Sequence, residues 1–164
     1  MFLAMGIILP FFTGQIPQIG SMLLPMHLPV FVCGMVCGGW DGGVVGFLMP
    51  ILRYMLFAMP PIFPTGLAMS FEMAVYGLVA GHLFQHNRWK CYKALYRSLI
   101  IAMISGRIVW GVVFACLCGI TSQTFTWMMF LASAFVEAIP GIILQLILVP
   151  ILVKNVFLHM VTLE

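Results

Sequence analysis

Four ionisable side chains stand inside long apolar stretches of this sequence: Arg53, Glu72, Arg107 and Glu137. The residues on either side of each are mainly Leu, Met, Val, Ile, Ala, Gly and aromatic residues, with no second charge close by. An isolated charge in an apolar medium is costly, so such residues usually face one another or line a polar cavity. The four charges are therefore the strongest indication of a functional site.

These charges allow two interpretations. In the first, two arginines and two glutamates form two ion pairs that hold four helices in register, which is plausible as a device for specificity. In the second, one or both arginines remain available to a ligand carboxylate or phosphate, because the guanidinium fork fits the oxygens of such anions. The two interpretations are compatible, and we favour the second.

Other side chains in the same stretches would add hydrogen bonds and flat contact surfaces to a ligand site. Tyr76, Trp110 and Gln145 are the main ones, and His27 lies where a helix is expected to begin. A single histidine at such a position more often packs against a loop or caps a helix. The predicted substrate-binding residues are Arg53, Glu72, Tyr76, Arg107, Trp110, Glu137, Gln145 and His27.

Sequence motifs for catalysis are missing. The chain has no Gly-x-Ser-x-Gly, no His-Glu-x-x-His and no glycine-rich loop that ends in Lys-Ser or Lys-Thr. His27 has no companion histidine or cysteine at the spacing of a zinc site. We expect no enzymatic activity, no bound metal or cofactor and no nucleic-acid partner. A transporter built on this chain must draw its energy from another protein.

The composition indicates a protein that lies in a lipid bilayer. Of the 164 residues 63% are hydrophobic and only 7% are charged, whereas soluble domains carry about a quarter charged residues. The apolar stretches do not alternate with polar residues as barrel strands do. We predict an all-α integral membrane protein with six transmembrane helices of about 20 residues each, in a single domain over residues 1–164.

The six helices are expected at about residues 1–12, 25–37, 44–59, 65–84, 95–119 and 125–153. The first is short for a membrane span, so it is either a short helix or the end of a longer one. Residues 38–43 are predicted to form a tight turn because four of the six are glycines, and residues 59–64 a stiff proline loop.

The basic residues predict the orientation of the helices. Residues 85–97 hold four of the seven Lys and Arg residues, so this predicted loop is cytoplasmic by the positive-inside rule. Lys154 then lies inside as well, and both termini are cytoplasmic. The uncharged loops at 14–24, 59–64 and 120–124 face outward, as a lid over an outward-facing pocket would. Helical rise places the four buried charges between the outer half of the membrane and its midplane.

Six segments in this order resemble the substrate-binding S components of energy-coupling factor (ECF) vitamin transporters. The resemblance covers nearly the whole chain, and the Pro-x-His-x-Pro-Val pattern lies in the first of the segments. The segments are residues 23–30 (LLPMHLPV), 46–53 (GFLMPILR), 59–61 (MPP), 71–81 (FEMAVYGLVAG), 105–111 (SGRIVWG) and 138–145 (AIPGIILQ).

This resemblance implies a bundle of six helices in the bacterial plasma membrane that captures a vitamin on its outer side. Its partners would be the vitamin, membrane lipid, and an ECF module of one transmembrane coupling subunit and two ATPase subunits. The most similar subgroup is the one linked to pantothenate, although riboflavin-type members share the histidine pattern. The carboxylate of pantothenate would meet Arg53 or Arg107.

The sequence departs from the family pattern in its first helix. Family members carry Ala-x-x-x-Ala there for contact with the coupling subunit, and this chain has only Ala4 and Gly6. Nickel-type members begin with Met-His, whereas Met26-His27 is internal, which argues against metal transport. The alternative from another class is a small membrane scaffold protein of the rod-shape type, whose buried charges would only set helix register.

Overall fold

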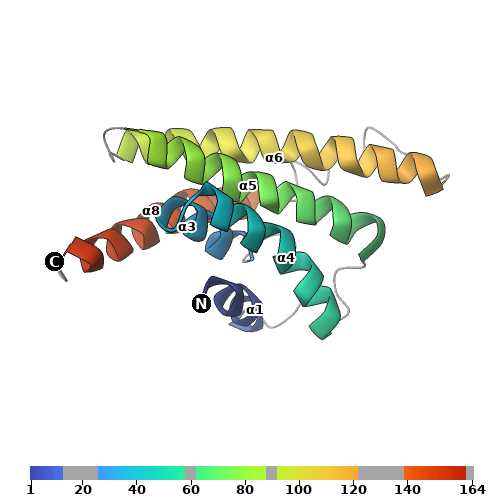
Figure 1. Ribbon diagram of the computed structural model, residues 1–164, viewed down its shortest axis with the longest axis horizontal. Helices are drawn as coiled ribbons and strands as arrows, with labels where there is room; N and C mark the ends of the chain where they lie inside the picture. Colours follow the sequence, from blue (N-terminus) through green and yellow to red (C-terminus); the bar gives the residue numbers. More distant parts are fainter. Residues whose placement is uncertain (13–25, 58–61, 88–91, 122–138, 162–164) are drawn as a thin grey trace.

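The computed structural model describes residues 1–12, 26–57, 62–87, 92–121 and 139–161. Within these ranges every regular element is helical and no strand occurs. The helices are α1 (Phe2–Phe12), α3 (His27–Val36), α4 (Gly39–Phe57), α5 (Leu67–His86), α6 (Tyr92–Thr121) and α8 (Ile139–Val161), with the irregular turn η1 (Ile62–Gly66) before α5. Figure 1 shows α5 and α6 side by side along the length of the molecule, with α4 crossing beneath α5.

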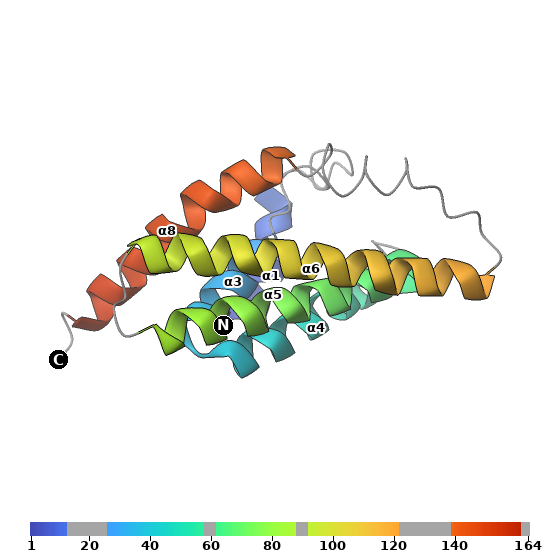
Figure 2. The same ribbon diagram turned by 90° about the horizontal axis from the view of Figure 1, so that it is seen from above.

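The described part of the chain confirms the all-helical prediction. Two of its helices are long and apolar enough to span a membrane. These two are Phe63–His86 and Lys93–Gly119. The apolar helices His27–Val36 and Gly141–Lys154 are shorter. Figure 2 shows α8 beside the beginning of α6 and diverging from it toward the other end of the molecule.

The centre of the bundle is a contact of α3, α4 and α5 made through glycines. A Cβ atom at Gly77 of α5 would overlap the backbone of Gly42 in α4, and a Cβ at Gly81 would overlap the carbonyl of Gly34 in α3. Side chains of any size would therefore force these backbones apart. Small residues at helix contacts are the usual means of close packing in membranes, where burial from water does not drive helices together.

The same contact explains why the predicted turn at residues 38–43 is wrong. Among residues 38–43 only Gly38 has a positive φ, at 137°, and α4 already begins at Gly39. The glycines that follow lie in the first turns of α4, where Gly39 meets the backbone of Leu78 and His82, and Gly43 meets the side chain of Leu78. They are needed for close packing rather than for the turn.

Two other predicted boundaries also differ from the structure. Residues 85–97 are not one loop, because α5 extends to His86 and α6 starts at Tyr92. Lys154 lies within α8 rather than after a helix that ends at Val153. Lysine and arginine are good helix formers, and a helix can continue beyond the apolar layer with its long cationic side chains in the interface.

Candidate functional site

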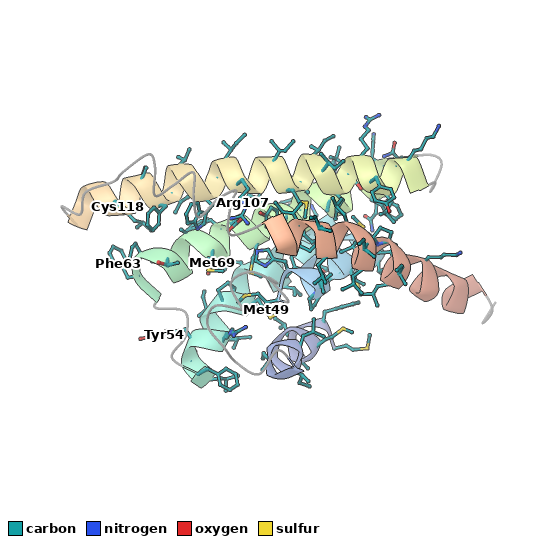
Figure 3. The ribbon with its side chains drawn as sticks, turned by 180° about the vertical axis from the view of Figure 1, so that it is seen from behind. Met49, Tyr54, Phe63, Met69, Arg107 and Cys118 are labelled. Carbon is teal, nitrogen blue, oxygen red and sulfur yellow. The ribbon has the colours of Figure 1, made fainter. Side chains whose placement is uncertain are left out.

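A buried polar network joins the middle of α6 to α5. Glu72 and Tyr76 are four residues apart on α5 and so share one face of that helix. The Tyr76 hydroxyl donates a hydrogen bond to Glu72 Oε1 at 2.5 Å. Arg107 Nη1 of α6 lies 3.3 Å from the same oxygen. Figure 3 shows Arg107 projecting from α6 toward the side on which α5 lies. This is one of the pairings that the sequence left open.

The two members of the ion pair differ in exposure. The Glu72 side chain is 2% exposed, whereas the Arg107 side chain is 15% exposed. The carboxylate is therefore enclosed, with a hydroxyl and a guanidinium on one of its oxygens, while part of the guanidinium side chain remains accessible. Arg107 is thus the more accessible member of the pair and Glu72 the enclosed one.

Glu72 and Arg107 lie at similar distances along their helices from the connection between α5 and α6, as their pairing requires. Glu72 lies 14 residues before the end of α5, and Arg107 lies 15 residues after the start of α6. At about 1.5 Å per residue both are about 21–22 Å from the α5–α6 connection. The pair therefore lies well inside the bundle, at the depth expected for the middle of α6.

Tyr76 is held by three neighbours, two of which the sequence analysis did not single out. Its ring lies 5.4 Å from the His27 ring and 5.1 Å from the Phe31 ring, measured between centroids. Gly106 packs against it on the other helix, since a Cβ at this position would overlap the Tyr76 ring. Phe31 follows His27 by one helical turn, and Gly106 precedes Arg107, so spacing from predicted residues would have pointed to both.

Arg53 lies on a different level from this network. The antiparallel contact of α4 with α5 brings Gly46 against Met73, and Arg53 is seven residues beyond Gly46, or about 10 Å further toward η1. Figure 3 shows Tyr54, the next residue, apart from Arg107. The Arg53 Nε atom is buried and has no hydrogen-bond partner among the described residues. Arg53 is therefore a second, half-buried arginine, separate from the ion pair.

Gln145 and Trp110 are also buried, in different surroundings. Gln145 lies on α8, and its Nε2 atom is buried without a hydrogen-bond partner in the described part of the chain. Trp110 lies one turn beyond Arg107 and stacks on Phe114, with ring centroids 5.0 Å apart and planes 11° apart. Trp110 also packs in a small cluster with Ala68 of α5, so much of its surface is already covered by protein.

Glu137, the fourth predicted charge, lies outside the described residues. Of the eight predicted site residues, the structure joins Glu72, Tyr76 and Arg107 in one network and places His27 against it. Arg53 and Gln145 contribute buried N–H donors from α4 and α8. Buried donors are nearly always satisfied, so these two atoms stand out among the described residues.

The comparisons with known proteins agree with the membrane character of the helices. The family model described as "ECF transporter, substrate-specific component" matches residues 1–153 of the chain. No curated protein and no solved structure matches the chain significantly.

Proposed function

Because the chain belongs to the family of substrate-specific components of ECF transporters, we propose that it binds a small vitamin that carries a carboxylate, with pantothenate as the first candidate. It is a membrane protein that recognises a substrate for transport, and membership in this family speaks against the rod-shape scaffold alternative. Riboflavin or another vitamin is the alternative substrate within the same function.

The observation that carries the choice of an anionic substrate is the unequal exposure of the Glu72–Arg107 pair. The carboxylate is enclosed and the arginine side chain retains accessible surface. In this arrangement Glu72 and Tyr76 position the guanidinium, and Arg107 offers its remaining N–H groups to the ligand. A carboxylate accepts such a charge-assisted hydrogen bond in a geometry that a neutral group does not match.

We include Arg53 and Gln145 as further donors in the proposed site. Their buried N–H donors suit hydroxyl, amide or carboxylate oxygens of a vitamin of extended shape. His27 and Tyr76 lie against each other beside the ion pair, and we include them as the ring surfaces that ligand pockets usually contain. We include Trp110 and Glu137 as further contacts on the basis of their positions in the sequence.

We further propose the topology and the partners that this role requires. Six membrane spans with both termini in the cytoplasm place the uncharged loops outside, where a vitamin arrives. Delivery then depends on a transmembrane coupling subunit and two ATPases, since the chain has no nucleotide-binding loop of its own. The bacterial plasma membrane is the corresponding location.

Binding of labelled vitamins to the purified protein tests this function directly. We expect saturable binding of pantothenate at micromolar concentration or below, and competition by unlabelled pantothenate but not by its carboxamide analogue. Riboflavin, which lacks a carboxylate, serves as the comparison within the family. Binding of riboflavin and not pantothenate would overturn the anionic substrate, and binding of no vitamin would overturn the function.

A further inference from the structure

Two histidines stack on each other near the end of α5. His82 and His86 are four residues apart, so their side chains lie on the same face of the helix. Their ring centroids are 5.8 Å apart and the ring planes differ by 10°. Both residues are exposed. The two imidazoles therefore face solvent as a pair.

The distance between the rings is close to that of two imidazoles on one metal ion. Imidazole nitrogens bind Zn²⁺ at about 2.0–2.1 Å in tetrahedral sites. Each nitrogen lies about 1 Å from the centre of its ring, so two imidazoles on such an ion have centroids about 5 Å apart. The observed separation of 5.8 Å is slightly longer. Small rotations of two exposed side chains remove this difference.

The backbone that carries the pair is held at both histidines. A Cβ at Gly39 would lie 3.0 Å from the backbone nitrogen of His82, so the start of α4 packs closely on α5 there. Beyond His86, the Asn87 side chain donates a hydrogen bond to the Leu83 carbonyl at 2.8 Å, which satisfies a carbonyl at the helix end. A site that is already ordered loses less freedom when it binds an ion.

A carboxylate adds negative charge near the pair. The Asp41 Oδ2 atom and the Gln85 side-chain amide both lie within 4 Å of the position that a Cβ at Gly38 would take. Gln85 shares the face of α5 that carries His82 and His86. Figure 2 shows the end of α5 beside the beginning of α4. Asp41 therefore favours a divalent cation at this end of α5 by electrostatic attraction.

We propose that His82 and His86 form a binding site for a transition-metal dication of the class of Cu²⁺, Ni²⁺ and Zn²⁺. Imidazole is a ligand that suits these ions. Among the described residues no group of three His, Cys, Asp or Glu side chains is placed to hold a metal ion, so the protein supplies two ligands and water completes the coordination. The sequence-based expectation of no bound metal considered His27 and not this pair. His82 lies about 15 Å along α5 from Glu72, so the metal site is separate from the proposed vitamin site.

Titration with each metal ion alone tests the site on the full-length protein, purified through a tag without histidine. We expect saturable binding of one equivalent of Cu²⁺, weaker binding of Ni²⁺ and Zn²⁺ as in the usual order of affinities, and no binding of Mg²⁺. Electron paramagnetic resonance of bound Cu²⁺ should show coupling to two imidazole nitrogens. Because the ion joins two turns of the folded helix, it should also raise the unfolding temperature.

Loss of an outer-shell partner alone costs about 10–100-fold in metal affinity, so His82→Gln and His86→Gln should each weaken Cu²⁺ binding at least about tenfold. Gln85→Ala is the matched control on the same face and should bind Cu²⁺ as the wild type does. All three positions are exposed, so each variant should unfold near the wild-type temperature in metal-free buffer.

Two results would overturn the site. Wild-type affinity in either histidine variant would place the metal elsewhere in the chain. A spectrum with a single coordinated nitrogen, or the absence of saturable binding, would show that His82 and His86 do not bind one ion together.

Discussion

At the scale of single residues, the Glu72–Arg107 pair joins the stability of the protein to the proposed recognition of an anionic ligand. Breaking a buried ion pair by removing one partner leaves an uncompensated charge, which costs about 3–5 kcal/mol in proteins. Glu72 is the more enclosed partner, so the loss of Arg107 should harm the fold as well as any anion site. A single substitution of Arg107 therefore cannot separate the two roles, whereas a paired substitution can.

We expect Arg107→Gln to lower both the unfolding temperature and the affinity for pantothenate. Glu72→Gln/Arg107→Gln removes both charges, so it should regain most of the lost stability but not the affinity. Thermal unfolding and equilibrium binding measured on the same preparations check this. Arg97→Gln, an exposed position on the same helix, should leave both quantities near wild type. If the double variant recovered binding together with stability, Arg107 would be a structural partner only.

At the scale of elements, α3, α4 and α5 form a unit whose backbones touch through glycines. Gly34, Gly42 and Gly77 meet at one point, and Gly81 reaches both Gly34 and Gly39. This packing sets the rotation of α5 and therefore the direction in which Glu72 and Tyr76 face α6. The proposed ligand site therefore depends on these glycines, although none of them has a side chain that could contact a ligand.

Gly77→Ala should destabilise the protein by at least about 2 kcal/mol, because its Cβ would overlap the backbone of Gly42 and backbone atoms cannot swing aside. Gly119→Ala is the matched control, since a Cβ at Gly119 meets nothing within 4 Å. Its unfolding temperature should stay near wild type. Thermal unfolding in detergent measures both. Equal stability of the two variants would contradict the close contact of α4 with α5.

At the scale of the whole molecule, the proposed function separates recognition of the substrate from the supply of energy. Helices α4, α5, α6 and α8 carry the donors of the proposed site, while the sequence has no loop for nucleotide hydrolysis. The described α1 is short, at 11 residues, and lacks the Ala-x-x-x-Ala surface that the family resemblance implied. In the proposed assembly the coupling contact would use the exposed Ala4 or another helix, because Gly6 is buried against Met49.

In proteoliposomes the chain alone should bind vitamin without accumulating it. Addition of a coupling subunit and its two ATPases should give ATP-dependent accumulation. Substitution of the nucleotide-binding lysine in the ATPases should abolish accumulation and leave binding unchanged. Accumulation by the chain alone would contradict the proposed dependence on an ECF module.

Apolar stretches of the sequence predict most of the described helices, but several helix ends differ in the structure. The apolar stretches determine where α3, α5 and α6 lie, because a membrane helix must be apolar over most of its length. The turn at residues 38–43 was predicted wrongly because glycine serves both turns and close helix contacts. Local sequence cannot distinguish a glycine in a turn from a glycine at a helix contact. The difference depends on whether the backbone of another helix packs against the glycine.

The sequence by itself determines that this is a helical membrane protein and that its buried charges are its most informative residues. Both conclusions depend on the cost of placing each residue in an apolar medium, which is a property of the residue and its neighbours in the chain. Only the tertiary structure decides that Arg107 pairs with Glu72 while Arg53 lies on another level. Pairing across helices depends on their relative rotation and register, which packing such as that of Gly42 on Gly77 sets between segments distant in sequence.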